Sequence, residues 1–212
     1  MAPRQARAEA TRQGIIDAAV QLFGEFGYAD TDMTDVVERA RTTGGTCYYY
    51  FPTKSTLATA IIEEANRGIA AEMAPIWESE APHMHRLIAA TFRFIAVTEN
   101  NPVVRVGYQL RQATRQASHS GTGSFGDTET VFASSIKRAV REGHARTDIN
   151  PREAAYTLFA ALVGCRLLAD AFDDDPFERL AQVWRTTLPS IASEDALPEL
   201  NRLVRARARE RR

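Results

Sequence analysis

Apolar residues recur at helical spacing along almost the whole chain. The first clear stripe is Ile15, Ala19, Leu22 and Phe26, at intervals of four, three and four. Such intervals place side chains on one face of an α-helix, and Gly27 is the kind of residue at which a helix ends. No stretch alternates apolar and polar residues in the way that predicts a β-strand. The pattern therefore predicts an all-α protein.

Two short helices are expected after this first one. Thr31 or Asp32 is a suitable N-cap for the earlier of the two. Its apolar face comprises Met33, Val36, Val37 and Ala40. Thr43 caps the later one, and Pro52 ends it because a residue before a proline is pushed out of the α conformation. Two short helices with a brief connection match a helix-turn-helix or, alternatively, a plain helical hairpin.

The later short helix carries no charged side chain. Residues 43 to 51 are small at the front and aromatic at the back. Small side chains let a helix backbone approach a DNA groove, and Tyr, Thr and backbone N–H groups donate hydrogen bonds to phosphates. We therefore expect this helix to contact DNA. The expected contacts on it are Thr43, Gly44, Gly45, Thr46, Tyr48, Tyr49 and Tyr50.

The charge of the chain gives no general argument for nucleic acid. The formal net charge is −1, and acidic residues outnumber basic ones in the first 54 positions. DNA affinity would then depend on a few well-placed cations, for which Arg4, Arg7, Arg12 and Lys54 are the candidates. The alternative is that these are solvated surface charges.

Apolar, turn and hydroxyl residues in the first quarter of the chain fall in a recognisable register. They are Thr11, Ile15, Ala18, Ala19, Leu22, Phe23, Gly27, Tyr28, Thr31, Asp35, Val36, Glu38, Arg39, Ala40, Thr43, Gly45, Tyr48, Tyr49, Phe51 and Lys54. In this register the segment resembles the N-terminal domain of the TetR family of transcriptional repressors. The resemblance implies an all-α homodimer whose third helix enters the major groove of an operator. Arg41 stands where the family usually has Gly, Gly44 where Lys is common and Tyr50 where His is common.

The sequence predicts three segments. Residues 1–53 form a helix-turn-helix DNA-binding domain, 54–195 a larger helical ligand-binding and dimerisation domain, and 196–212 a basic tail. Thr53 caps a long helix from Lys54 to about Ala74, which Pro75 ends or kinks. This helix would carry the headpiece, because a unit of about 50 residues buries too little surface to be stable alone. Further helices are expected over 87–97, from Pro102 and over 127–142, with a Ser- and Gly-rich loop at 118–126.

Two long helices near the C-terminus have matching starts. Asn150-Pro151 and Asp175-Pro176 each place a cap before a proline, with Glu two residues later to reach back to the N–H of the cap. Ala154 to Ala171 is nearly apolar on every side, which predicts burial by more than the core of its own subunit. A second stripe comprises Leu180, Val183, Trp184, Thr187 and Leu188. Two such helices predict a four-helix dimer interface with Leu162 at its seam, or alternatively an intrachain core. For the basic tail we favour a solvated, frayed terminus over a DNA contact.

Other functional classes find little support in the sequence. Cys47 and Cys165 are too few and too far apart for a disulfide framework, and no segment has the pattern of a secretory signal or a membrane span. We expect a cytoplasmic protein. His83 and His85 fall on different sides of a helix, and the segment 118–120 lacks a nucleophile elbow, so we expect no metal, cofactor or catalytic centre. The alternatives to a regulator are a helical-bundle enzyme and a dimeric adaptor that does not bind DNA.

The larger domain offers residues for an apolar pocket with a few polar anchors. The candidates for ligand binding are Trp77, Phe92, Tyr108, Gln109, Thr128, Phe132, Tyr156 and Thr157, with Phe159 beside them. The alternative for each aromatic residue is ordinary core. We expect a ligand-responsive repressor that binds a palindromic operator as a homodimer and is released by a small apolar effector.

Three segments of the larger domain, 102–110, 148–149 and 163–166, are similar to the γ-butyrolactone receptor branch of the TetR family. That resemblance implies a small lactone or furan signal as the effector, and it places the pocket tryptophan of the branch at Thr128. Two alternatives follow from the missing indole. The chain takes a different or bulkier molecule, such as an antibiotic, or it has lost lactone sensing.

Overall fold

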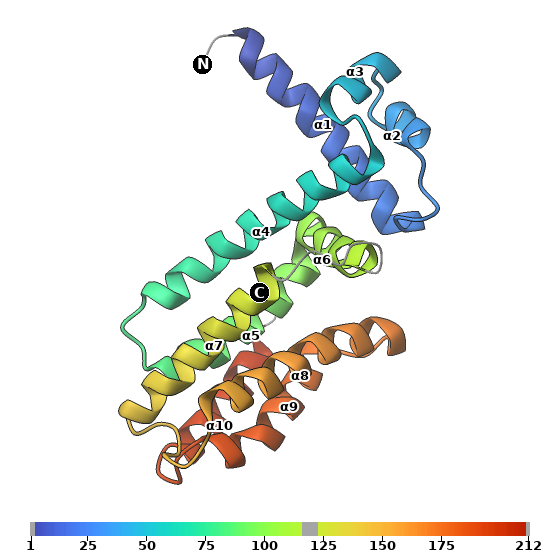
Figure 1. Ribbon diagram of the computed structural model, residues 1–212. Helices are drawn as coiled ribbons and strands as arrows, with labels where there is room; N and C mark the ends of the chain where they lie inside the picture. Colours follow the sequence, from blue (N-terminus) through green and yellow to red (C-terminus); the bar gives the residue numbers. More distant parts are fainter. Residues whose placement is uncertain (1–2, 116–122, 211–212) are drawn as a thin grey trace. The chain divides into compact units, whose positions relative to one another are not determined.

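The computed structural model describes residues 3–115 and 123–210, and within these ranges every regular element is a helix. The helices are α1 (Pro3–Phe26), α2 (Met33–Arg39), α3 (Gly44–Tyr50), α4 (Lys54–Glu78), α5 (His83–Asn100), α6 (Pro102–Arg115), α7 (Gly123–Arg141), α8 (Pro151–Phe172), α9 (Pro176–Ile191) and α10 (Leu197–Arg209) (Figure 1). The all-α prediction is confirmed. The loop expected at 118–126 is helical from Gly123 onward, and the segment 118–120 lies outside the described residues.

The chain divides into two compact units that do not follow the expected segment boundaries. The first unit comprises Met1–Ala71 and Val97–Ser120, and the second comprises Glu72–Ala96 and Gly121–Arg212. The expected boundary after residue 53 therefore falls inside the first unit. The reason is that the first half of α4 and the helix α6 supply part of the core on which α1 packs.

The core of the first unit is built mainly from the apolar stripe of α1. Ile15, Ala19 and Leu22 are buried as their spacing predicts, whereas Phe26 is 52% exposed because α1 ends there. The residues that join this core from the other helices are Val36, Cys47, Phe51, Leu57, Ile61, Val106 and Leu110. The three N-terminal helices thus share one core with α4 and α6, which explains why they fold as part of a larger unit.

The core of the second unit gathers side chains from five helices. Its largest fully buried side chain is Trp184 on α9, whose indole N–H donates to the hydroxyl of Thr91 on α5 at 2.9 Å. That bond satisfies the one polar atom of the indole inside an apolar environment. The other core residues include Leu87, Ile88, Ile95, Phe132, Ile136, Leu158, Leu162, Leu180, Leu188, Leu200 and Val204.

The helices α6, α8 and α9 begin at the caps that the sequence predicts. The side chain of Asn101 accepts from the N–H of Val103, that of Asn150 from Arg152, and that of Asp175 from Phe177, each at 3.0 Å. The predicted role of the following glutamates is not seen. Glu153 accepts from the side-chain amide of Asn150, and Glu178 pairs with Arg185.

The C-terminal segment is an ordered part of the second unit, so the expectation of a frayed, solvated tail is wrong. Leu200 and Val204 of α10 are fully buried against the core. The arginines conceal this apolar stripe in the sequence because they occupy positions between its members, on the face of α10 that points to solvent.

The helix α8 is apolar nearly all round, but its faces have different environments. Leu162 is 5% exposed within the core, whereas Leu167, Leu168 and Phe172 are 52%, 53% and 69% exposed. The placement of Leu162 at a dimer seam is therefore wrong. The apolar stripe of α9 also faces the core of its own unit, which is the intrachain alternative. Among the described helices, none is long and apolar enough to span a lipid bilayer.

Candidate DNA-binding and ligand-binding residues

The connection between α2 and α3 is a tight turn centred on Arg41. The N–H of Arg41 donates to the carbonyl of Glu38 at 3.0 Å, and the N–H of Thr42 donates to the carbonyl of Val37 at 3.2 Å. Arg41 takes a left-handed backbone conformation with φ of 50°. These two bonds and the left-handed residue form the Schellman motif that ends many helices, usually with glycine at this position. The turn that a glycine would normally make is therefore present, although an arginine makes it.

The caps of α2 and α3 hold the two helices in register. The carboxylate of Asp35 accepts from the N–H of Asp32 at 2.8 Å, which fixes the start of α2. The hydroxyl of Thr43 accepts from the N–H of Thr46 at 3.2 Å, as the sequence predicts. One of the residues proposed to contact phosphate thus also caps the helix.

The side chains of α3 separate into a buried anchor and an exposed face. Cys47 is fully buried in the core of the first unit, and burial raises the pKa of its thiol, which keeps it protonated and apolar in character. Tyr48 and Tyr49 are 49% and 81% exposed. Tyr50 is partly buried, and its ring packs edge to face on the ring of Tyr49, with 5.2 Å between the ring centroids. Tyr50 therefore belongs to the packing of α3 more than to its exposed face.

The leading end of α3 is unobstructed. A Cβ atom built at Gly44 or Gly45 would meet nothing within 4 Å in the part of the chain that the structure describes. Packing within the protein therefore does not require glycine at either position. Both glycines and Thr46 leave the backbone accessible to an approaching surface, which is what a base-edge contact in a groove needs.

The expected phosphate contact Lys54 is held by the protein itself. Its ammonium group donates to the carbonyl oxygens of Tyr28 at 2.9 Å, Ala29 at 3.2 Å and Thr31 at 2.8 Å. It also lies 4.7 Å from the centroid of the Tyr28 ring. An ammonium group has three protons, so these carbonyls use all of them. In this arrangement Lys54 fastens the loop before α2 to the start of α4.

The basic residues of α1 differ in their surroundings. Arg7 is exposed, and the side chain of Arg4 lies outside the part that the structure describes. The guanidinium of Arg12 lies 5.4 Å from the centroid of the Phe51 ring, so it packs on the residue that ends α3. Arg39 forms an ion pair with Glu25 at 3.4 Å. Arg7 and Arg41 are thus the exposed cations near the helix-turn-helix for which no internal partner is described.

The predicted ligand-binding residues are divided between the two units. Tyr108 and Gln109 belong to the first unit, and the other predicted residues belong to the second. Gln109, Tyr156 and Thr157 are exposed, Tyr156 by 64%, because each lies on the outer side of its helix. None of the three is enclosed within its own unit, and their assignment to a ligand pocket stays a prediction.

The remaining predicted ligand residues have mixed surroundings. Phe132 is buried and meets the ring of Phe159 edge to face at 6.2 Å, which is the ordinary-core alternative. Trp77 is partly buried against the same core, and Thr128 is partly buried on α7. Phe92 is buried and lines a cavity of about 310 Å³ in the second unit.

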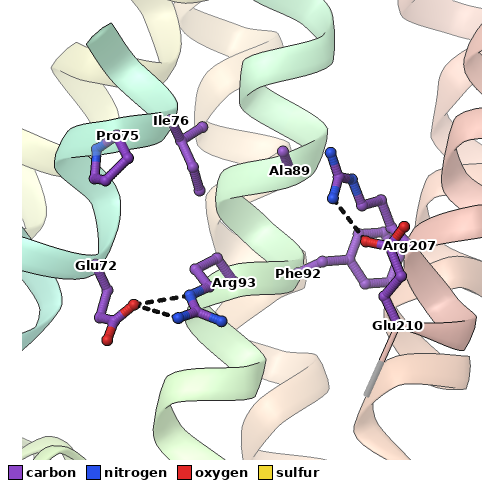
Figure 2. Close-up of a pocket in the computed structure, with 8 residues that line it drawn as sticks. All are labelled: Glu72, Pro75, Ile76, Ala89, Phe92, Arg93, Arg207 and Glu210. Carbon is purple, nitrogen blue, oxygen red and sulfur yellow. Dashed lines mark hydrogen bonds and ion pairs between the residues drawn. The ribbon is translucent and has the colours of Figure 1, made fainter. Parts of the chain in front are cut away.

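That cavity lies among α4, α5 and α10. Figure 2 shows the eight residues that line it, which are Glu72, Pro75, Ile76, Ala89, Phe92, Arg93, Arg207 and Glu210. Sequence reasoning identified only Phe92 among them. Glu72 and Arg93 form an ion pair there and are both partly exposed, so no signal in the sequence marks them as lining a cavity.

Three of the four histidines lie together at one end of the second unit. His83 pairs with Glu142, and His85 pairs with Glu199 at 2.8 Å. The rings of His85 and His144 meet edge to face at 5.6 Å. Within the described residues, no group of three or more His, Cys, Asp or Glu side chains has a geometry that could hold a metal ion.

Comparison with known proteins shows which proteins this chain resembles. Residues 15–61 match the profile of the bacterial regulatory proteins of the tetR family. The sequence is 28% identical to the A-factor receptor protein of Streptomyces griseus, over 98% of this chain and 75% of the relative. A solved γ-butyrolactone receptor, described as an ArpA-like protein, is 28% identical with a TM-score of 0.81, covering 96% of this chain and 99% of that one.

A second solved structure is CprB of Streptomyces coelicolor in complex with its biological operator sequence. It is 27% identical with a TM-score of 0.80, over 96% of this chain and 99% of that one. With its capped helix-turn-helix and these matches, the chain resembles the transcriptional regulators of the tetR family and, among them, the γ-butyrolactone receptors.

Proposed function

We propose that the protein is a ligand-responsive repressor that binds a palindromic operator as a homodimer and is released by a small apolar effector. The proposal that the protein binds DNA rests on the exposed face of α3, which has no charged side chain and two exposed tyrosines. The similarity to a protein solved with its operator supports the same conclusion. The similarity to a solved γ-butyrolactone receptor supports a small-molecule effector.

The exposed face of α3 gives each group a role. We assign Tyr48 and Tyr49 to contacts with phosphates, and Gly44, Gly45 and Thr46 to the base edges. Arg7 of α1 supplies an exposed cation. No internal partner of its side chain is described, so binding a phosphate would break no contact described within the protein. Because Lys54 is held by carbonyls, we assign it to positioning the helix-turn-helix.

The dimer is proposed to form on the exposed face of α8. Leu167, Leu168 and Phe172 make an apolar surface there that nothing in the described part of the chain covers. A two-fold pair of chains matches the two half-sites of a palindrome, which sets the separation of the two α3 helices.

Release requires more than effector binding. An effector shifts an equilibrium only by the difference in its affinity for the two states, so it must favour a spacing of the two α3 helices that does not fit DNA. The helix α4 is one covalent route between the units, because it begins at Lys54 in the first and ends at Glu78 in the second, and α5 is another. A coupling of about 1–3 kcal/mol would lower operator affinity about 5- to 150-fold.

A gel shift and a footprint on the DNA flanking the gene of this protein test the proposal. We expect protection of a palindrome, with one dimer bound, and its loss on addition of an effector. The effector is sought by a thermal-shift screen of butyrolactones, butenolides, furans and antibiotics. Absence of sequence-specific protection would favour the adaptor, and turnover of a screened compound would favour the helical-bundle enzyme.

A further inference from the structure

We propose that the protein selects thymine in its operator by the C5-methyl group of that base, which the methyl group of Thr46 contacts. This proposal deepens the proposed function and rests on its assignment of α3 to DNA. What it adds is the chemistry by which α3 distinguishes one base pair from another.

The side chains of α3 exclude the hydrogen-bond pairs that usually identify bases. Arg and Lys select guanine in the major groove, Asn and Gln select adenine, and Asp and Glu accept from cytosine. The helix comprises two glycines, one threonine, one cysteine and three tyrosines, so it contains none of these six residue types. Base selection by α3 must therefore use another kind of contact.

Thr46 has the one side chain of α3 that remains for a base edge. Its neighbours Gly44 and Gly45 have no side chain, and Cys47 is fully buried in the core of the first unit. Of the three tyrosines, the last packs on the ring before it, and the two exposed ones are assigned to phosphates. The side chain of Thr46 is only partly buried, so part of it faces solvent.

The hydroxyl group of Thr46 is engaged within the protein. Its Oγ1 lies 2.9 Å from Oγ1 of Thr43, and the backbone N–H of Thr46 donates to the same oxygen of Thr43 at 3.2 Å. Both contacts belong to the cap at the start of α3, which a base would disturb if it took the hydroxyl. The methyl group is bonded to the same Cβ and extends in another direction from it. An approaching base therefore meets an apolar group.

Thymine is the base that presents an apolar group in the major groove. Its C5-methyl group has no counterpart on adenine, guanine or cytosine. The backbone N–H groups in the first turn of α3 could also reach bases, but a single donor finds an acceptor on adenine, guanine and thymine alike. Such donors do not select thymine, whereas contact between two methyl groups does.

Arg41 is the competing candidate for base recognition. It is exposed in the turn before α3, and its guanidinium is the group that pairs with N7 and O6 of guanine. If Arg41 selected the bases, guanine would be the base whose alteration matters. Contact with a methyl group and contact with guanine therefore predict different effects of modified bases.

The experiment modifies the operator that the footprint defines. Each thymine is exchanged for deoxyuridine, one symmetric pair of positions at a time, which removes only the C5-methyl group. Each guanine is exchanged in the same way for 7-deazaguanine, which removes the N7 acceptor. Gel shifts with the full-length protein give Kd. One buried methyl group accounts for about a 3- to 5-fold change, so we expect one thymine pair at which deoxyuridine weakens binding by about 10- to 25-fold.

Variants of Thr46 remove the same contact from the protein. Thr46→Ser keeps the hydroxyl that pairs with Thr43 and deletes only the methyl group, so its melting temperature should stay close to that of wild type. It should bind the thymine operator about 10- to 25-fold more weakly and lose nothing further on the deoxyuridine operator. Thr46→Val keeps a methyl group and should still distinguish the two operators. Thr147→Ser, in the exposed loop between α7 and α8, should match wild type on both.

Two results would overturn the inference. One is an operator in which no deoxyuridine pair weakens binding by more than about twofold, and a loss confined to 7-deazaguanine would then assign recognition to Arg41. The other is an effect of deoxyuridine that is as large in Thr46→Ser as in wild type. A protein that protects no DNA in the footprint fails the proposed function itself. One that protects a palindrome but does not distinguish deoxyuridine from thymine keeps that function and loses only this inference.

Discussion

The ammonium nitrogen of Lys54, at the first residue of α4, lies 2.8 Å from the carbonyl oxygen of Thr31, in the loop before α2. With two more carbonyls bound by the same group, this contact holds the helix-turn-helix to the helix that supports it. Lys54→Met should therefore lower the free energy of unfolding by about 1–3 kcal/mol, because it leaves three carbonyl acceptors, two of them part-buried, without a charged donor. DNA binding should weaken equally on all sequences, with the slope of affinity against salt unchanged. Thermal melts and salt titrations of a gel shift measure both quantities.

Arg7→Gln is the matched variant for Lys54→Met. Arg7 is exposed on α1 and holds nothing in the core. If it contacts a phosphate, its loss should flatten the salt slope by about one unit while the melting temperature stays constant. A flattened slope in Lys54→Met with unchanged melting would show instead that Lys54 leaves its carbonyls to bind phosphate.

Arg41→Gly should change stability and DNA affinity in opposite directions. A residue other than glycine at φ of 50° carries backbone strain, so glycine should stabilise the first unit by about 0.5–1 kcal/mol after its own entropy cost. The variant also loses an exposed cation between α2 and α3, so operator affinity should fall and the salt slope should flatten. Arg41→Ala removes the charge but keeps the strain. Equal melting temperatures for the Gly and Ala variants would contradict the strain argument.

Gly107 on α6 and Ala65 on α4 approach so closely that a methyl group at position 107 would overlap the Cβ of Ala65. Gly107→Ala should destabilise the first unit by about 1–3 kcal/mol through overpacking, less the helix propensity that alanine gains. The double variant Ala65→Gly, Gly107→Ala should recover part of this loss. Urea melts of the four proteins give the coupling energy, and purely additive effects would exclude the contact.

The sequence predicts local structure in this chain better than it predicts contacts. The caps Thr43, Asn150 and Asp175 were predictable because a cap depends on residues a few positions away. The left-handed turn at Arg41 was predictable only through the resemblance to a family that has glycine there. The partners of Lys54 were not predictable, because backbone carbonyls leave no trace in the sequence.

The candidate ligand residues show the same limit. An aromatic residue on an apolar helix face gives the same sequence pattern whether it lines a cavity, as Phe92 does, or packs in the core, as Phe132 does. Tyr156 belongs to a helix that is apolar on all sides, so periodicity could not say which side faces solvent. The buried residues Leu200 and Val204 were hidden in a segment that resembled a basic tail.

Acid should weaken the contact between α5 and the end of α7. His83 lies against Glu142, with Nδ1 of the histidine 2.5 Å from Oε1 and its backbone N–H 2.8 Å from Oε2. Burial by itself raises the pKa of Glu142, but the hydrogen bonds from His83 and the charges of His83 and His144 lower it below the ordinary 4.5, and the net shift is downward. The unfolded chain then binds the proton more tightly. The stability from this contact is complete above pH of about 4.5 and is lost as the pH falls through the lower folded value.

Glu142→Gln should therefore lower the free energy of unfolding at pH 7 by about 0.5–1.5 kcal/mol. The difference from wild type should shrink below pH of about 4, where the wild-type carboxylate also becomes neutral. Melts at pH 3.5 to 7.5 follow this change. Glu63→Gln, exposed on α4, loses the same charge and should show no such convergence. A difference between Glu142→Gln and wild type that is constant with pH would exclude titration of Glu142 as its source.

Two charged substitutions on α8 should separate folding from assembly. Leu162 is buried in the core of its own unit, so Leu162→Glu should destabilise the fold by at least about 2–5 kcal/mol and unfold much of the protein. Leu168 is 53% exposed on the face proposed for the second copy, so Leu168→Glu should leave the monomer folded and dissociate the dimer. Light scattering gives the mass, and circular dichroism gives the helix content. Because a palindrome needs two linked headpieces, the dissociated variant should also lose operator affinity by at least about 100-fold. A Leu168→Glu protein that stays dimeric with wild-type melting would place the interface on another face.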